Sequence, residues 1–149
     1  MHLATNIAVA LVALVTTAQA AWRMACGKGG NAQFHIIHDR PYLSTLCSMT
    51  PDDDHKQMCT MLDLGGCYQN SNGHLLATIN GRFEHSCQHC HLTGVNKTIF
   101  ACDCQMFGKN APWQYTEIET EDLIENQAGF LTCWNAGHQK CPGMPDVQV

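Results

Sequence analysis

The stretch GRFEHSCQHCHLTGVNKTIFACDC, residues 81–104, predicts a β-hairpin that is held together by its own cysteines. Cys87 and Cys90 precede a glycine-containing turn, and Cys102 and Cys104 follow it. Opposed Cβ atoms of neighbouring antiparallel strands are about 4.5–5.5 Å apart, close to the roughly 3.5–4.5 Å that a disulfide needs. We therefore expect two disulfides, Cys87–Cys102 and Cys90–Cys104, and a hairpin that is the rigid frame of any binding site.

The N-terminal segment, residues 1–20, has the pattern of a secretory signal peptide. An apolar run from Ile7 to Val15 is followed by Ala18-Gln19-Ala20, an A-x-A cleavage signature, although no Lys or Arg precedes the run. This run is too short to span the roughly 30 Å hydrocarbon core of a bilayer. We therefore expect a secreted, extracellular mature chain that begins at Ala21.

All ten cysteines lie after this segment, and an even number of cysteines in a secreted chain indicates a disulfide framework. The sequence leaves open the pairing of six of them: Cys26, Cys47, Cys59, Cys67, Cys133 and Cys141. The net charge of −5 argues against a nucleic-acid or anionic-membrane partner. A neutral or polar ligand is therefore expected.

The rest of the chain consists of short strand-like patterns separated by turns, which indicates an all-β fold with short helical turns. Strands are expected at residues 34–37, 42–47 and 115–120, and also at Leu75 and Leu131. Loops are expected at 49–54 and 108–112, a turn at 71–73 and a helical turn at 121–126. Residues 21–33 are interpreted as an N-terminal arm tied by Cys26, and 135–149 as a tail that Cys141 could anchor.

The sequence also contains a weak internal duplication. LSTLC at 43–47 is similar to TIFAC at 98–102, and CYQNSNGHLL at 67–76 is similar to LIENQAGFL at 123–131. Both matches have nearly the same offset along the chain. Because two units are too few for a solenoid, we expect two halves, about 34–80 and 83–134, that complete each other in one pseudo-symmetric domain.

The order and spacing of these features resemble the cyanovirin-N homology lectins, whose two sequence repeats fold into one mostly β domain. The second half matches the family pattern at Phe83, Cys87, Leu92, Gly94, Cys102, Ile118, Ile124, Asn126, Gly129 and Leu131. In the first half, Phe34 is placed at the start and His38 at the position of the first family cysteine. Cys47 matches the second cysteine of the family pattern, and Cys26 is its possible disulfide partner. The resemblance covers 34–134, and secreted members in filamentous fungi suggest a fungal source.

The resemblance implies non-covalent binding of oligomannose-type or related glycans in two shallow pockets. Carried over by position, the better-preserved pocket would use Gln69, Asn70, Asn72, Asn80, Arg82, His85, Ser86, Asp103 and Gln105. The other would use Gln33, Ile36, Ile37, Ser48, Met49, Thr50, Asn126 and Gln127. The second pocket is expected to bind weakly, because it is less polar and Ala128 replaces the usual Asp. Exchange of halves between chains makes a monomer and a domain-swapped dimer both possible.

Several of these residues also have a purely structural interpretation. Asn70, Asn72 and Asn126 suit turns, because asparagine tolerates the left-handed region and bonds to its own backbone. Arg82 could be an ordinary surface charge. Trp22, Trp113 and Trp134 could stack on sugar, but packing in the core or tail is the expected role of each.

Two other classes of function were weighed. His85, His89 and His91 alternate with Cys87 and Cys90, a set that would suggest zinc in a reducing compartment. In a secreted chain the thiols should oxidise, so no metal and no cofactor are expected. Two alternatives stay open: a secreted interaction protein or effector that kept the fold but lost sugar binding, and an extracellular metal binder that uses the His/Cys cluster.

Two further features bear on processing and chemistry. Asn96-Lys97-Thr98 is an N-glycosylation sequon in the predicted hairpin turn. No nucleophile elbow, phosphate-binding loop or H-E-x-x-H motif occurs in the sequence. We therefore expect a binding protein that is not an enzyme.

Overall fold

The structure is a computed structural model that describes residues 22–26, 31–50, 53–134, 138–143 and 147–148. The expected signal peptide lies outside the described residues. Among the helices that are described, none has the length and apolar character needed to cross a membrane.

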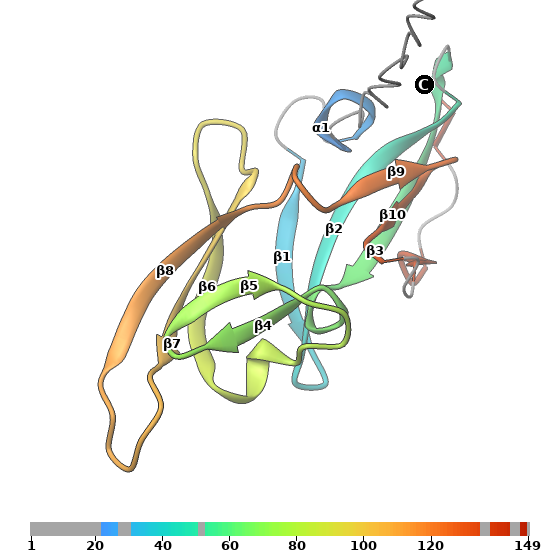
Figure 1. Cartoon of the computed structure of the whole chain (residues 1–149). Coiled ribbons are helices and arrows are strands. Elements are labelled where there is room, and N and C mark those ends of the chain that lie inside the picture. The colour runs from blue at the N-terminus through green and yellow to red at the C-terminus, as the bar shows by residue number, and fades with distance from the viewer. Residues whose placement is uncertain (1–21, 27–30, 51–52, 135–137, 144–146, 149) are drawn as a thin grey trace, which may run out of the picture.

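The described secondary structure is almost entirely β, which confirms the predicted class (Figure 1). In chain order, with η marking a short 3-10 helix, the elements are α1 (Trp22–Ala25), β1 (Gln33–Ile37), β2 (Arg40–Thr50), β3 (Asp53–Asp63), η1 (Leu64–Gly66), β4 (Tyr68–Ser71), β5 (His74–Ala77), η2 (Phe83–His85), β6 (Cys87–Thr93), β7 (Ile99–Gln105), β8 (Trp113–Glu119), β9 (Glu125–Gln127), β10 (Phe130–Thr132), β11 (His138–Lys140) and β12 (Val147–Gln148).

The two halves of the chain have the same architecture. Each contains an antiparallel three-stranded arrangement, β1–β2–β3 or β6–β7–β8, followed by a hairpin, β4–β5 or β9–β10. Each hairpin packs on the sheet of the other half (Figure 1). The backbone N–H of Leu75 donates to Thr116 Oγ1, and that of Leu131 donates to Thr60 Oγ1, both at 3.1 Å. Leu75 is as far from Leu131 along the chain as Thr60 is from Thr116, so the halves complete each other as the duplication predicted.

The strand register shows that the first repeat starts earlier in the chain than predicted. Cys47 faces Met58 on β3, and Cys104 faces Gln114 on β8. Met58 and Gln114 are separated by the same offset as Leu75 and Leu131, so Cys47 is the counterpart of Cys104. The predicted match of Cys47 to Cys102 is therefore shifted by two residues.

The disulfide of Cys47 extends this correspondence to the N-terminus. Cys26 bonds to Cys47, as the resemblance suggested, and Cys87 bonds to Cys104. Trp22-x-x-x-Cys26 is thus the counterpart of Phe83-x-x-x-Cys87, and each begins with a short helix, α1 or η2. The placement of Phe34 and His38 at the repeat start was wrong. Phe34 faces Leu43, as Leu92 faces Phe100, so Phe34 corresponds to Leu92.

The two disulfides of the central hairpin differ from the predicted pairs. Cys87 bonds to Cys104 and Cys90 to Cys102. Pairs in an antiparallel hairpin must nest, whereas Cys87–Cys102 and Cys90–Cys104 would cross, so the prediction was wrong on geometry. A β-bulge between Gln88 and His91 shifts the register and allows both nested pairs to form.

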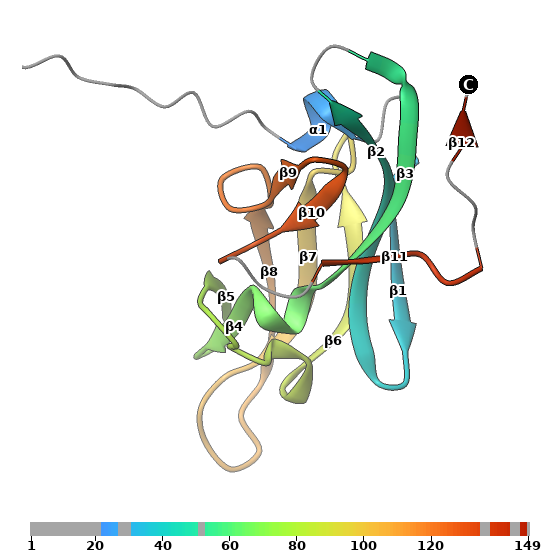
Figure 2. The ribbon, with the colours of Figure 1, turned by 90° about the vertical axis from the view of Figure 1, so that its right-hand side faces the viewer.

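The described parts of the tail add strands to the sheet of the first half. β11 and β12 both pair with the edge of β3, on the side of the molecule away from β8 (Figure 2). A Cys59–Cys141 disulfide holds this segment, which confirms Cys141 as an anchor, and Cys67–Cys133 completes the set. All ten cysteines are therefore oxidised.

Two smaller expectations need adjustment. Strands β2 and β3 continue into the predicted loop at 49–54, up to Thr50 and from Asp53. The predicted helical turn at 121–126 is a single turn, closed by a 2.8 Å bond from the Ile124 N–H to the Thr120 carbonyl. β9 then begins at Glu125.

The core lies between the two halves, with aromatic side chains at its centre. The Phe100 ring is 5.4 Å from Phe34, 5.9 Å from Tyr68 and 5.2 Å from Phe83, measured between ring centroids. Tyr68 is fully buried, and its hydroxyl has no hydrogen-bond partner among the described residues. Burial, together with the carboxylates of Glu119 and Asp122, raises the pKa of this phenol above its ordinary value of 10.0.

We expect Tyr68→Phe to stabilise the protein by about 1–2 kcal/mol, because it removes a buried hydroxyl that makes no hydrogen bond. Urea unfolding of the oxidised protein near neutral pH measures this difference. The raised pKa favours the neutral phenol in the folded state, so the parent should lose stability as pH rises above about 10, where the unfolded chain ionises. Tyr68→Phe should lose less over that range. A variant that is less stable than the parent at neutral pH would contradict the prediction.

Candidate functional site

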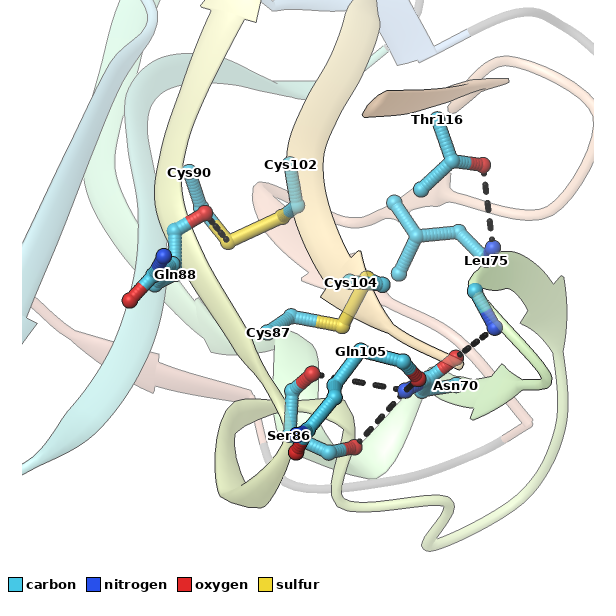
Figure 3. Close-up of a disulfide and its surroundings, with 11 residues drawn as sticks. Asn70, Leu75, Ser86, Cys87, Gln88, Cys90, Cys102, Cys104, Gln105 and Thr116 are labelled. Carbon is cyan, nitrogen blue, oxygen red and sulfur yellow. Dashed lines mark hydrogen bonds between the residues drawn. A yellow bond between two sulfur atoms is a disulfide. The ribbon is translucent and has the colours of Figure 1, made fainter. Parts of the chain in front are cut away.

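The centre of the better-preserved predicted site is Asn70, at the end of β4. Its Nδ2 donates to the Ser86 hydroxyl at 2.9 Å, to the Ser86 carbonyl at 3.3 Å and to the Gln105 carbonyl at 2.8 Å (Figure 3). Its Oδ1 accepts from the Gly73 N–H at 2.8 Å. Both ends of this amide are thus used within the protein. Asn70 holds three segments together, as the structural interpretation proposed.

The turn after Asn70 is bound to the end of β7. Asn72 adopts a left-handed backbone with φ of 52°, and its Oδ1 accepts from the Phe107 N–H at 2.9 Å. Gly73 follows with φ of 88° and packs against Met106 and Gln114, leaving little room for a side chain. The turn chemistry predicted from Ser71-Asn72-Gly73 therefore positions this loop beside Gln105.

The disulfide-held hairpin supplies the opposite wall. The Gln105 N–H donates to the Ser86 carbonyl at 2.8 Å, and the residues next to these two, Cys87 and Cys104, form a disulfide (Figure 3). Gly81 packs on the backbone of Gln69, where a Cβ would collide with the Tyr68 carbonyl and the Gln69 side chain. The site is thus formed by the β4–β5 turn, η2 and the end of β7, all on one rigid frame.

Polar groups remain around this frame. The side chains of Gln69 and Gln105 are partly exposed, and those of Asn72 and His85 are exposed. They supply amide donors and acceptors and an imidazole, which can pair with groups that both donate and accept. Asn80 is exposed in the connecting loop, with its N–H bonded to the Gly66 carbonyl at 2.9 Å.

Two predicted members of the site have partners elsewhere. Arg82, which precedes η2, has its Nη1 3.3 Å from carboxylate oxygens of both Asp63 and Glu84. Asp103 lies 3.0 Å from His89 Nδ1 and faces Tyr115 across the strands. The strong charge-assisted bonds that these two side chains would offer a ligand are therefore not part of the Asn70 site.

Comparison with known proteins identifies the fold. The sequence model of the CVNH domain matches residues 32–133. The chain belongs to the CVNH family.

Solved structures agree with this assignment. The CVNH protein of N. crassa is 14% identical with a TM-score of 0.57, covering 70% of this chain and 92% of that one. Microvirin, solved with mannobiose, is 24% identical with a TM-score of 0.51, covering 69% and 94%. A MoCVNH3 variant, solved with (N-GlcNAc)4, is 14% identical with a TM-score of 0.55, covering 68% and 93%. No curated protein matches the chain.

The second predicted pocket of this CVNH domain has the same framework with fewer polar groups. Asn126 Nδ2 donates to the Ser48 carbonyl at 2.9 Å, and its Oδ1 accepts from the Gly129 N–H at 2.9 Å. These bonds repeat those of Asn70, because Ser48 corresponds to Gln105. Ala25 takes the place of Ser86, so the hydroxyl partner is missing.

Methionines surround this second framework. Met24 is 67% exposed and Met49 is 37% exposed, with Met49 packed against the turn at Gly129. Gln127 and Thr50 are exposed nearby on β9 and β2. The apolar character predicted for this pocket is present, and it is stronger than the sequence indicated because α1 contributes Met24 and Ala25.

Three residues assigned to the second pocket lie elsewhere. Gln33 faces Ser44, which is four residues before Ser48 and thus about 13 Å away along the strand. Ile36 and Ile37 lie at the opposite end of β2, next to the His38–Asp39 turn. These assignments were wrong because they followed from placing the repeat start at Phe34.

The His/Cys cluster does not form a metal site of the proposed kind. All of its cysteines are in disulfides, so no thiolate remains to bind zinc. Within the described part of the chain, no group of three or more His, Cys, Asp or Glu side chains could hold a metal ion.

Proposed function

We propose that the protein is a secreted lectin that binds neutral, mannose-rich glycans at the site formed by Gln69, Asn72, His85 and Gln105 around Asn70. The observation that carries this proposal is the set of hydrogen bonds from the Asn70 side chain to Ser86, Gln105 and Gly73, which we call the Asn70 brace. It holds amide-rich segments on a frame that is cross-linked by disulfides. A rigid site loses little conformational entropy on binding. Membership of the CVNH family and the mannobiose complex of microvirin support a sugar ligand.

The charge and geometry of the site favour a neutral polyol. Vicinal hydroxyls donate and accept at once, and amide side chains match both roles. Arg82 is engaged by two carboxylates, and the chain carries a net charge of −5. An anionic glycan would therefore find little to compensate its charge. We propose recognition without catalysis.

The two pockets should differ in affinity. The second has methionines and alanines where the first has His85, Ser86 and Asn72, so it offers few hydrogen bonds to a sugar. One functional site per chain removes the avidity that two linked sites would give. The choice between monomer and domain-swapped dimer stays a prediction.

Secretion and glycosylation belong to the same proposal. Five disulfides are typical of an oxidising compartment, which supports cleavage before Ala21 and an extracellular location. Asn96 is exposed in the turn between β6 and β7, where an attached glycan would not cover Asn70.

Isothermal titration of the secreted, oxidised protein with a branched oligomannose tests the proposal. The double substitution Gln69→Ala, Asn72→Gly should weaken binding by more than about tenfold, because each lost polar contact contributes roughly 1 kcal/mol. Glycine at 72 preserves the positive φ. The matched control is Glu125→Ala, which changes the counterpart of Gln69 in the other hairpin and should bind as the parent does.

The opposite result has a clear meaning. If the parent binds neither oligomannose nor any member of a glycan array, the lectin proposal is wrong. The interaction-protein alternative would then hold for this CVNH domain. If the double variant binds as tightly as the parent, the glycan binds outside the Asn70 site.

A further inference from the structure

The outward face of β6–β7–β8 carries two large exposed aromatic side chains. Trp113 is 46% exposed and Tyr115 is 54% exposed, two residues apart on β8. The intervening Gln114 and the following Thr116 point to the inner side, where Thr116 is buried. Alternate residues of a strand share one face and are about 6.8 Å apart. The two rings therefore lie in a row on the outer surface, contrary to the packing role expected for Trp113.

Polar side chains flank this row. Gln105 faces Trp113, and Asp103 faces Tyr115 across the ladder. The Tyr115 hydroxyl donates to Glu117 at 2.6 Å, and His89 Nδ1 lies 3.0 Å from Asp103. We call the set Gln105, Trp113, Tyr115 and Asp103 the aromatic platform. It combines ring faces with hydrogen-bonding groups on a sheet in which two disulfides join β6 to β7.

The equivalent face of the other half is occupied differently. The offset that relates Met58 to Gln114 also relates Cys59 to Tyr115, and Cys59 is bonded to Cys141 of the tail. That disulfide and Pro142 help to line a cavity of about 430 Å³ over β1–β2–β3. On β6–β7–β8, no described segment takes this place. Among the described residues, the second half therefore leaves uncovered a face on which the first half carries part of the tail.

We propose that the aromatic platform binds a neutral saccharide chain that extends from the Asn70 site, an inference that rests on the proposed function. Sugar rings present a face of weakly positive C–H groups, which pack favourably on the negative face of an aromatic ring. Trp and Tyr provide this contact area at a low entropic cost. Asp103 and Gln105 can pair with the ring hydroxyls.

Two observations favour a glycan as the occupant. Gln105 belongs to both surfaces, because its carbonyl accepts from Asn70 and its residue faces Trp113. The platform is therefore continuous with the site around the end of β7. The carboxylates of Asp103, Glu117 and Glu119 lie on this face, and they disfavour phosphate- or sulfate-bearing partners.

Titration with two ligands of different length tests the inference. Mannobiose should occupy the Asn70 site alone, whereas a branched oligomannose should also reach the platform. Trp113→Ala, Tyr115→Ala should weaken the oligomannose about ten- to a hundredfold and leave mannobiose unchanged. Trp113→Phe, which keeps an aromatic ring, should weaken oligomannose binding much less. The matched control is Trp134→Ala, because Trp134 is also 46% exposed but lies outside the platform.

Fluorescence gives a second, local readout. Trp22 is buried, so in the Trp134→Ala background Trp113 is the exposed tryptophan of the chain. Saturating oligomannose should protect it from iodide quenching, and mannobiose should not. Circular dichroism and the thermal midpoint establish that each variant is folded.

The outcomes separate the two proposals. Oligomannose binding that is unchanged in the folded double alanine variant would overturn the platform and leave the lectin proposal intact. Equal loss of both ligands would also overturn it, since the platform would not be a separate extension. A parent that binds neither ligand would overturn both proposals, and the open face would then suit a protein partner.

Discussion

Replacing Trp22 with alanine should destabilise the protein by about 3–5 kcal/mol, a large part of the stability of a domain of this size. Trp22 is 1% exposed and belongs to the core between the two halves. Its indole N–H donates to the buried Thr120 hydroxyl at 3.0 Å, which in turn donates to the Thr98 carbonyl at 2.6 Å. The substitution leaves a cavity and removes the donor from this buried chain. Urea unfolding of the oxidised variants measures the effect.

Trp22→Phe should cost clearly less than Trp22→Ala, because phenylalanine fills the equivalent position, Phe83, in the second half. The control is Trp134→Ala, which removes a half-exposed tryptophan and should change stability little. An unfolding midpoint for Trp22→Ala equal to that of the parent would mean that Trp22 does not contribute to the core between the two halves.

The hairpin, the turns and the two-half plan could be predicted because local chemistry determines them. Asn72-Gly73 needs positive φ values, and cysteines on both arms of 81–104 indicate a cross-linked hairpin. The exact disulfide partners depend on a β-bulge between Gln88 and His91. No local residue preference predicts this bulge. The nesting of pairs in an antiparallel ladder was nevertheless a usable constraint.

The start of the first repeat was missed for a physical reason. Trp22 replaces the phenylalanine of the pattern, and the segment from Cys26 to Phe34 is longer than the equivalent segment from Cys87 to Leu92. A sequence comparison that tolerates no insertion therefore chooses Phe34. The shared core environment of Trp22 and Phe83, both 1% exposed, is visible only when the two halves are packed together.

Side-chain direction limited the prediction of the site. The resemblance placed Asn70, Ser86 and Gln105 in one pocket, and the structure joins them through hydrogen bonds from Asn70 to two backbone carbonyls and one hydroxyl. Arg82 has a left-handed backbone with φ of 54°, which accompanies its pairing with Asp63 and Glu84. Asp103 points outward because its neighbours Cys102 and Cys104 point inward. Neither direction follows from the order of residues in a motif.

Asn70→Ala should lower stability by about 2–3 kcal/mol and weaken glycan binding by more than tenfold. The substitution removes the donor to Ser86 and Gln105 and the acceptor for Gly73, and each such bond contributes about 1 kcal/mol. The turn that carries Asn72 would then be held less firmly against the end of β7. Asn70→Asp should not rescue binding, because its oxygens would face the Ser86 and Gln105 carbonyls. Urea unfolding and titration with oligomannose measure the two effects.

The matched variant is Asn126→Ala, which breaks the corresponding bonds to Ser48 and Gly129 in the other hairpin. It should cost about 1–2 kcal/mol, less than Asn70→Ala because no serine hydroxyl is involved, and it should leave binding intact. The pair separates bracing from direct contact with sugar. If Asn70→Ala kept the stability of the parent and still lost the glycan, Asn70 would be a ligand of the sugar and the brace would be unimportant. If both variants lost stability and neither lost binding, the glycan would bind at neither turn, and the site would have to be sought on the outward face of β6–β7–β8.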